Sequence, residues 1–94
     1  MGEKKELFFI TVIGRDRKGI VARVSGLLYE NGINIEDITQ KVMEGYFVMT
    51  LIADIIETKT PIEQIRSGLK KIGEEMNLDI QIQHENIFNM MHRV

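Results

Sequence analysis

The sequence predicts an α+β fold in which a four-stranded antiparallel sheet carries two helices on one face. Two segments, residues 20–30 and 62–76, have apolar side chains at a helical period, and four other segments are rich in β-branched and aromatic residues. The elements follow the order strand–helix–strand–strand–helix–strand, with only two residues between the second and third strands. This order is typical of a ferredoxin-like βαββαβ sandwich.

The four predicted strands differ in their patterns. Residues 7–13 are apolar almost without interruption, which indicates a strand covered on both faces. Residues 34–43 and 46–55 form the next two strands, and Glu44-Gly45 between them is expected to be a hairpin turn. Residues 78–83 alternate apolar and polar side chains, so the last strand is expected to be half exposed.

The two predicted helices have clear boundary signals. The first is expected to end at Asn31-Gly32, because asparagine and glycine tolerate the left-handed conformation. The second is expected to begin with Thr60 as its N-cap, Pro61 at its first position and Glu63 completing a capping box. In the first helix Ser25 and Gly26 are small, which would let the helix lie close to the sheet.

The chain of 94 residues is expected to form one domain, since domains of about 100 residues are common. Its core is expected to span about residues 7–85. Residues 86–94 then form a C-terminal extension, in which a short helix capped by Asn86 is predicted.

Both faces of the predicted sheet carry apolar side chains, although two helices can cover only one of them. In the first strand Phe8 and Ile10 alternate with Phe9, and the third strand has a similar pattern. A homodimer that buries the second face is therefore expected. The alternative is that the C-terminal segment folds back over this face, using Ile87, Phe88, Met90 and Met91.

The composition argues against several classes of protein. The chain has no cysteine, so disulfides and thiolate metal sites are excluded, and His84 and His92 lack a metal-ligand spacing. No apolar run approaches the about 20 residues of a membrane span, and the charged N-terminus does not resemble a signal peptide. A net charge of −2 and a pI near 5.7 disfavour nucleic acid as a partner. We expect a cytoplasmic protein without a metal or cofactor.

Catalytic motifs are also missing. Gly14 and Gly19 have a spacing similar to that of a phosphate-binding loop, but Ile20-Val21 stands where lysine and serine or threonine are required. Ser25 and Ser67 lie on predicted helices and have no neighbouring base in the sequence. The sequence therefore predicts a protein that binds rather than one that catalyses a reaction.

Two segments, Asp16-Arg17-Lys18-Gly19-Ile20-Val21 and Gly32-Ile33-Asn34-Ile35, resemble those of the ACT domain, a small regulatory module that commonly binds amino acids. The resemblance covers about residues 7–83. The ending, with Asn86-Ile87-Phe88 and Met90-Met91, is similar to small bacterial stand-alone ACT domain proteins. Those proteins are related to the ACT domains of the glycine cleavage system transcriptional repressor.

The resemblance implies an amino-acid site at a subunit interface, between the first strand–helix loop of one chain and the start of the second strand. Carried over to this sequence, it implicates Asp16, Gly19, Ile20 and Asn34. Many amino-acid-binding members have asparagine at the position of Asp16 and proline at that of Lys18.

The chemistry of these residues suits an amino acid. An α-carboxylate can accept hydrogen bonds from the backbone N–H groups of Gly19, Ile20 and Val21 at the helix N-terminus. Arg17 is a further expected contact for an anion. An α-ammonium needs acceptors, which Asp16 and the amide oxygen of Asn34 can supply.

Two alternatives have other functions. One is a ligand-free dimerisation or protein-interaction module that serves gene or metabolic regulation and has a regulatory protein as its partner. It would show intact packing with no pocket at Asp16 and Asn34, where Asp16 could be an N-cap or turn residue and Asn34 a turn residue. An RNA-binding RRM shares the order of elements, and residues 7–10 and 45–48 superficially resemble its aromatic motifs. Glu44 and the net negative charge argue against the RRM.

Overall fold

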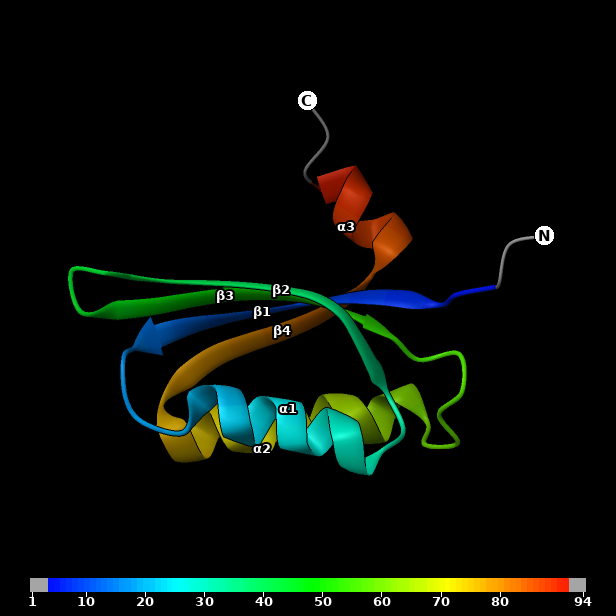
Figure 1. Cartoon of the computed structure of the whole chain (residues 1–94), viewed down its shortest axis with the longest axis horizontal. Coiled ribbons are helices and arrows are strands. Elements are labelled where there is room, and N and C mark those ends of the chain that lie inside the picture. Colours follow the sequence, from blue (N-terminus) through cyan, green and yellow to red (C-terminus); the bar gives the residue numbers. More distant parts are fainter. Residues whose placement is uncertain (1–3, 92–94) are drawn as a thin grey trace.

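The computed structural model describes residues 4–91, without the side chains of residues 88, 89 and 91. It confirms the predicted order of elements and the short additional helix at the C-terminus (Figure 1). The elements are β1 (Leu7–Arg15), α1 (Ile20–Glu30), β2 (Asn34–Met43), β3 (Tyr46–Asp54), α2 (Ile62–Met76), β4 (Leu78–His84) and α3 (Glu85–Met91).

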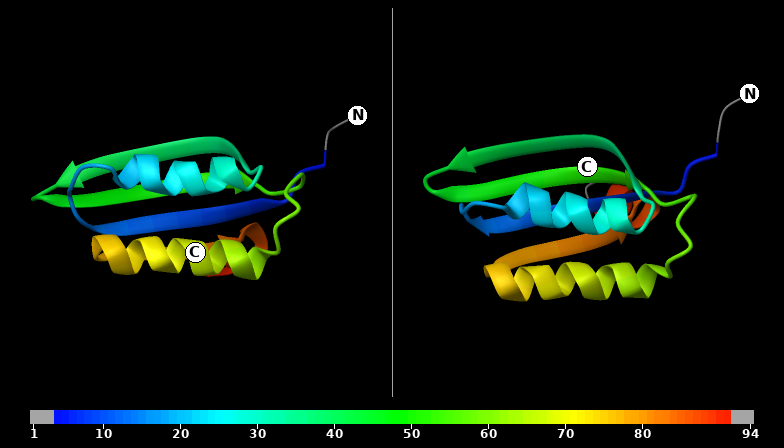
Figure 2. Two further views of the ribbon diagram at one scale, coloured as in Figure 1. Left: turned by 90° about the horizontal axis from the view of Figure 1, so that it is seen from below. Right: turned by 60° about the horizontal axis from the view of Figure 1, so that its bottom comes forward.

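The strands form one antiparallel sheet in the order β2-β3-β1-β4. Helices α1 and α2 lie side by side under one face, α1 toward β2 and α2 toward β4 (Figure 2). This is the predicted α+β, ferredoxin-like arrangement. The register pairs Val12 of β1 with Met49 of β3 on one side and with Ile80 of β4 on the other.

The core lies between the sheet and these two helices. Alternate residues of the central strands point into it, such as Ile10 in β1 and Leu51 in β3, both of them fully buried. The helices contribute their apolar stripes, as the helical period predicts. The buried helical residues are Ile20, Val24, Leu28, Ile65, Leu69, Ile72, Gly73 and Met76.

The turns that join the elements follow the predicted signals. Glu44 and Gly45 both have positive φ, 54° and 81°, as the hairpin turn that matches the twist of two strands requires. Gly32 has a φ of 70° directly after α1, and Ile33 N–H donates to the carbonyl of Leu28. The expected end of α1 at Asn31-Gly32 is confirmed.

Two predicted helix caps are wrong. Pro61 has an extended ψ of 144° and is itself the N-cap of α2, so Thr60 lies outside the helix. The Thr60 hydroxyl instead donates to the side-chain oxygen of Asn31, which ties the start of α2 to the end of α1. Helix α3 begins at Glu85, so Asn86 lies inside it, and Asn86 N–H donates to Nδ1 of His84.

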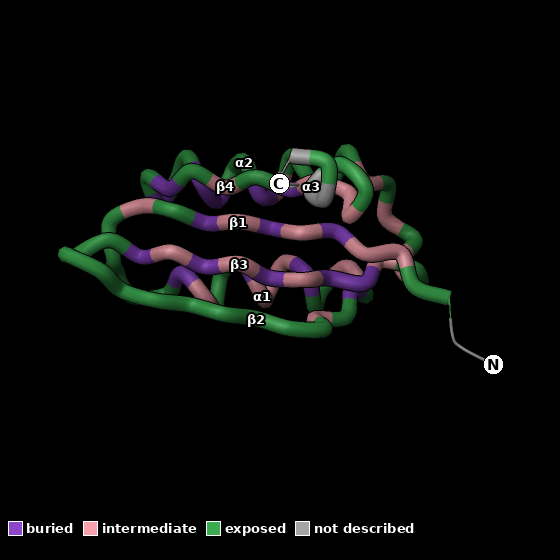
Figure 3. The backbone as a smooth tube through the Cα atoms, turned by 90° about the horizontal axis from the view of Figure 1, so that it is seen from above, coloured by how far each residue is buried: buried purple, intermediate pink, exposed green. Residues whose placement is uncertain are grey.

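On the face of the sheet opposite α1 and α2, here called the open face, the described part of the C-terminal segment contacts only β1 and β4. Helix α3 rises from the end of β4 at one border and leaves β3 and β2 uncovered (Figures 1 and 3). The exposed fractions of Ile87 and Met90 are 52% and 72%. The side chains of Phe88 and Met91, also expected to cover this face, lie outside the described residues.

Candidate functional site

The loop between β1 and α1 leaves the N-terminus of α1 open. Gly19 is the N-cap, with a φ of 89° that disfavours residues with a Cβ, and no side chain caps the helix. The carbonyl of Gly19 accepts from Arg23 N–H, so the N–H groups of Ile20 and Val21 have no acceptor within the helix. The Ile20 side chain is buried, which leaves only its backbone for a ligand.

The loop is fixed to the tip of the β2–β3 hairpin. Asp16 N–H donates to the carbonyl of Gly45 at 2.9 Å, and the Arg15 guanidinium lies 4.6 Å from the centre of the Tyr46 ring. Asp16 and Arg17 are exposed, and among the described residues the Asp16 carboxylate has no hydrogen-bond or ion-pair partner. The carboxylate therefore does not act as the N-cap or turn acceptor that a purely structural role of Asp16 would give it.

Asn34 lies far from this loop in the same chain. It starts β2 just beyond the end of α1, whereas the loop precedes the start of α1 (Figure 1). The 11 residues of α1 separate the two places by about 16 Å, at a rise of about 1.5 Å per residue. One chain thus brings together Asp16, Arg17, Gly19, Ile20 and Val21 but not Asn34.

A short chain of polar contacts orients the Asn34 side chain. Asn34 Nδ2 donates to one oxygen of Glu36 at 2.6 Å, and Lys5 Nζ contacts the other oxygen at 2.6 Å. These hydrogen bonds, first that from Lys5 and then that from Asn34, lower the pKa of Glu36. Since an ionised carboxylate only accepts, the Asn34 amide turns its nitrogen to Glu36 and keeps its oxygen available.

A groove of about 560 Å³ runs beside Asn34 along the outer surface of α1. Tyr29 borders it and is 83% exposed. Gly26 also borders it, and a Cβ there would meet no atom within 4 Å, so the expectation that Gly26 brings α1 close to the sheet is wrong. Sequence reasoning missed Tyr29, although an aromatic residue outside the apolar stripe of α1 was a visible signal.

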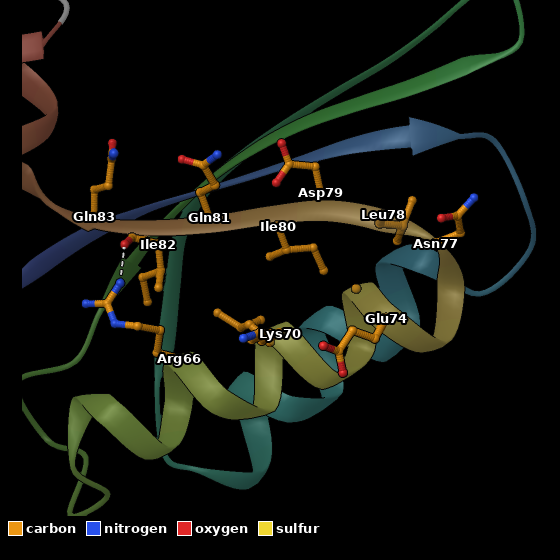
Figure 4. Close-up of a pocket in the computed structure, with 12 residues that line it drawn as sticks. Arg66, Lys70, Glu74, Asn77, Leu78, Asp79, Ile80, Gln81, Ile82 and Gln83 are labelled. Carbon is orange, nitrogen blue, oxygen red and sulfur yellow. Dashed lines mark hydrogen bonds between the residues drawn. The ribbon is translucent and has the colours of Figure 1, made fainter.

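A larger groove, of about 640 Å³, lies at the opposite edge of the molecule between α2 and β4 (Figure 4). None of the predicted site residues lines it. Arg66 reaches across it and donates from Nη1 to the carbonyl of Ile82 at 2.8 Å. This carbonyl points away from the sheet, toward the side where a further strand would pair. Because Arg66 already donates to it, the guanidinium hinders the pairing of another strand with the β4 edge.

The other edge of the sheet, along β2, is open. Met43 and Tyr46 close the hairpin, so residues 39, 41 and 43 pair with β3 and residues 38, 40 and 42 direct their backbone groups outward. The N–H of Ile38 accordingly donates to Oδ1 of Asp37 rather than to β3. Ile38 and Val42 are also 38% and 54% exposed, which makes this edge suited to pairing with another strand.

Within residues 4–91 no helix is long and apolar enough to cross a membrane. Among the same residues no group of three or more histidine, aspartate or glutamate side chains is placed to hold a metal ion.

Comparison with known proteins agrees with the expected family. The model of the ACT domain family matches residues 8–87. A UPF0237 protein of Clostridium perfringens is 45% identical over 85 residues, which are 90% of this chain and 96% of that protein.

Solved structures show the same relationship. An ACT domain protein from Streptococcus pneumoniae has a TM-score of 0.77 and 38% identity, over 90% of this chain and 96% of that one. A glycine cleavage repressor-like structure shares the fold, with a TM-score of 0.73 and 23% identity over 87% of this chain and 47% of that one. The chain therefore belongs to the ACT domain family, whose members are commonly regulatory, and to its stand-alone UPF0237 proteins.

Proposed function

We propose that this chain is a cytoplasmic, non-enzymatic regulatory protein that binds a small amino acid or a similar metabolite between two identical copies. One observation carries the proposal: the two halves of the expected site lie at opposite ends of the same edge. The loop Asp16–Gly19 lies beside the end of β2, through the Asp16–Gly45 hydrogen bond, and Asn34 is the first residue of β2.

A twofold axis beside the middle of β2 unites these halves. Two β2 strands can pair antiparallel through their outward backbone groups at residues 38, 40 and 42. Each start of β2 then lies next to the hairpin tip, and hence the loop, of the other copy. The pairing would also bury Ile38 of one copy near Val42 of the other, which favours association.

The united site offers complementary groups to both charged ends of an amino acid. The N–H groups at the start of α1 and the Arg17 guanidinium suit a carboxylate, helped by the helix dipole. The Asp16 carboxylate of one copy and the Asn34 oxygen of the other suit an ammonium group. A ligand held by both copies would stabilise the pair, and it can shift the equilibrium only by its difference in affinity for the two states.

Thermal unfolding with each common amino acid tests this proposal. A ligand at about 100 times its dissociation constant adds about 2.7 kcal/mol to the free energy of unfolding. That gain raises the midpoint of so small a domain by roughly 10–20 °C. Asp16→Ala and Asn34→Ala should each abolish the shift, while the control Glu74→Ala, on the exposed surface of α2, should keep it.

The outcomes distinguish a regulatory protein that binds an amino acid from a module that acts without a ligand. A shift that survives in both site variants would contradict the assignment of the site. If no amino acid shifts the midpoint but the midpoint rises with protein concentration, the chain is a ligand-free dimerisation or protein-interaction module in gene or metabolic regulation.

A further inference from the structure

Tyr29 stands on the outer side of α1, outside the apolar stripe of that helix. It is 83% exposed, and its hydroxyl has no hydrogen-bond partner among the described residues. Tyr29 is the tenth of the 11 residues of α1, so it lies about 14 Å from Ile20 along the helix and near the start of β2. The ring therefore borders the same groove of about 560 Å³ as Asn34.

This groove carries no charged residue and is largely apolar. Ile33, which is buried, and Ile35, which packs against the core, form its base. On the side of α1 the lining residues Ala22 and Gly26 are small. Ser25 offers no free donor, because its hydroxyl already donates to a backbone carbonyl of α1 at 2.6 Å. The groove thus suits an apolar group, since a charged one would lose water without gaining a partner.

Asn34 also borders a second cavity, of about 570 Å³, with the opposite chemistry. Acidic and basic side chains line it, among them Glu36 and Glu57. It lies on the β3 side of β2, where Asn34 pairs with Asp54, and therefore away from the edge that a second copy would meet. A ligand with a charged side chain would have to use this second cavity.

In the pair of the proposed function, the apolar groove faces the second copy. Helix α1 lies under the β2 edge (Figure 2), so two paired β2 strands bring the two α1 helices side by side in opposite directions. The end of one α1, with Tyr29, then lies next to the start of the other. The groove beside Asn34 of one copy is thereby continuous with the loop that holds Asp16 in the other.

We propose that this groove takes the side chain of the bound amino acid, and that Tyr29 selects amino acids with a large, uncharged, apolar side chain. The inference rests on the proposed function, which supplies the contacts of the carboxylate and the ammonium group. The Tyr29 ring packs against the ligand side chain and shields it from water. Gly26 leaves room for it, because even a Cβ there would meet no atom within 4 Å.

Isothermal titration calorimetry of the full chain with glycine, L-alanine, L-leucine and L-phenylalanine tests this, because these probes share their charged groups and differ in the side chain. The wild type should bind leucine and phenylalanine at least about tenfold more tightly than alanine, since one methylene in an apolar pocket already changes affinity by about tenfold or more. L-glutamate and L-lysine should bind no more tightly than alanine.

Variants of Tyr29 test its part in this selection. Tyr29→Ala should weaken the binding of leucine about tenfold and that of alanine less than about twofold, so the preference for leucine falls. Tyr29→Phe keeps the ring and should bind both probes as the wild type does. The matched control Ile87→Ala removes another exposed apolar side chain, on α3, and should keep the preference for leucine.

The other outcomes contradict different parts of the reasoning. Equal affinity of the wild type for alanine and leucine, or tighter binding of glutamate or lysine, would overturn the apolar groove as the place of the side chain and leave the proposed function standing. If Tyr29→Ala weakened all probes equally, Tyr29 would only support the pairing of the two copies, and its role in selection would be overturned. If no probe binds, the proposed function is contradicted and this inference falls with it.

Discussion

Gly73 lies where α2 passes close to the backbone of β4, and its replacement by alanine tests how tightly these elements pack. A Cβ at Gly73 would lie 2.7 Å from the carbonyl oxygen of Leu78. Asn77 alone joins α2 to β4, in a left-handed conformation with a φ of 57°, so the helix cannot withdraw without moving the strand. Gly68, in the same helix, is the matched control, because a Cβ there meets only the flexible end of Leu27, at 3.1 Å.

The magnitudes follow from two opposing effects. Alanine in place of a helical glycine gains about 1 kcal/mol in helix propensity at either position. Overpacking costs about 1–3 kcal/mol, and we expect about 3 kcal/mol at Gly73, since a backbone carbonyl cannot turn aside. Gly73→Ala should therefore lower the free energy of unfolding by about 2 kcal/mol. Gly68→Ala should raise it by about 0.5 kcal/mol, because Leu27 can move.

Equilibrium unfolding in urea, followed by far-ultraviolet circular dichroism, measures both changes. Gly73→Ala should shift the midpoint down by about 1–2 M without changing the slope, as expected for a small domain. Equal stability of the Gly73→Ala and Gly68→Ala proteins would refute the close contact between α2 and the β4 backbone.

Two further changes test contacts of α1. Arg23 donates a hydrogen bond to Glu75, which lowers the pKa of Glu75 below its ordinary 4.5. The stability that this bond contributes is complete above the pKa of the unfolded chain, and it is lost as the pH falls through the pKa of the folded protein. Unfolding midpoints measured from neutral to acidic pH should thus fall less steeply in Glu75→Gln than in the wild type; identical profiles would contradict this. Asn31→Ala removes the bonds from Asn31 to the Leu27 carbonyl and from Thr60, and should cost about 1–2 kcal/mol by thermal unfolding. An unchanged midpoint would show that water replaces both bonds.

The fold could be predicted because its elements depend on local signals. The apolar period of α2 and the left-handed Gly32 act over a few residues, and the structure places each as expected. The cap at Thr60 failed for a tertiary reason, since its hydroxyl bonds Asn31, 29 positions away in the sequence. Local preference is overridden where a distant partner satisfies the same polar group.

The candidate site was predictable only in part. The loop from Asp16 to Val21 is contiguous, so its grouping follows from the sequence. The contacts that orient Asn34 involve Lys5, 31 residues from Glu36, and no spacing rule connects them. The exposed Tyr29 could be recognised in the sequence as an aromatic residue outside the apolar stripe of α1. The groove beside it could not be predicted, because it depends on where α1 lies against β2.

The set of elements and the two-sided apolar character of β1 and β3 follow from local patterns along the chain, because side-chain alternation is a property of a single strand. Which surfaces remain available depends on how the elements pack together. Arg66 bonds a carbonyl at the β4 edge, and β2 is left with outward backbone groups. Helix α3 contacts β4 and β1 on one side of the open face and leaves β2 and β3 uncovered. These outcomes depend on contacts between residues far apart in the chain, which local patterns do not specify.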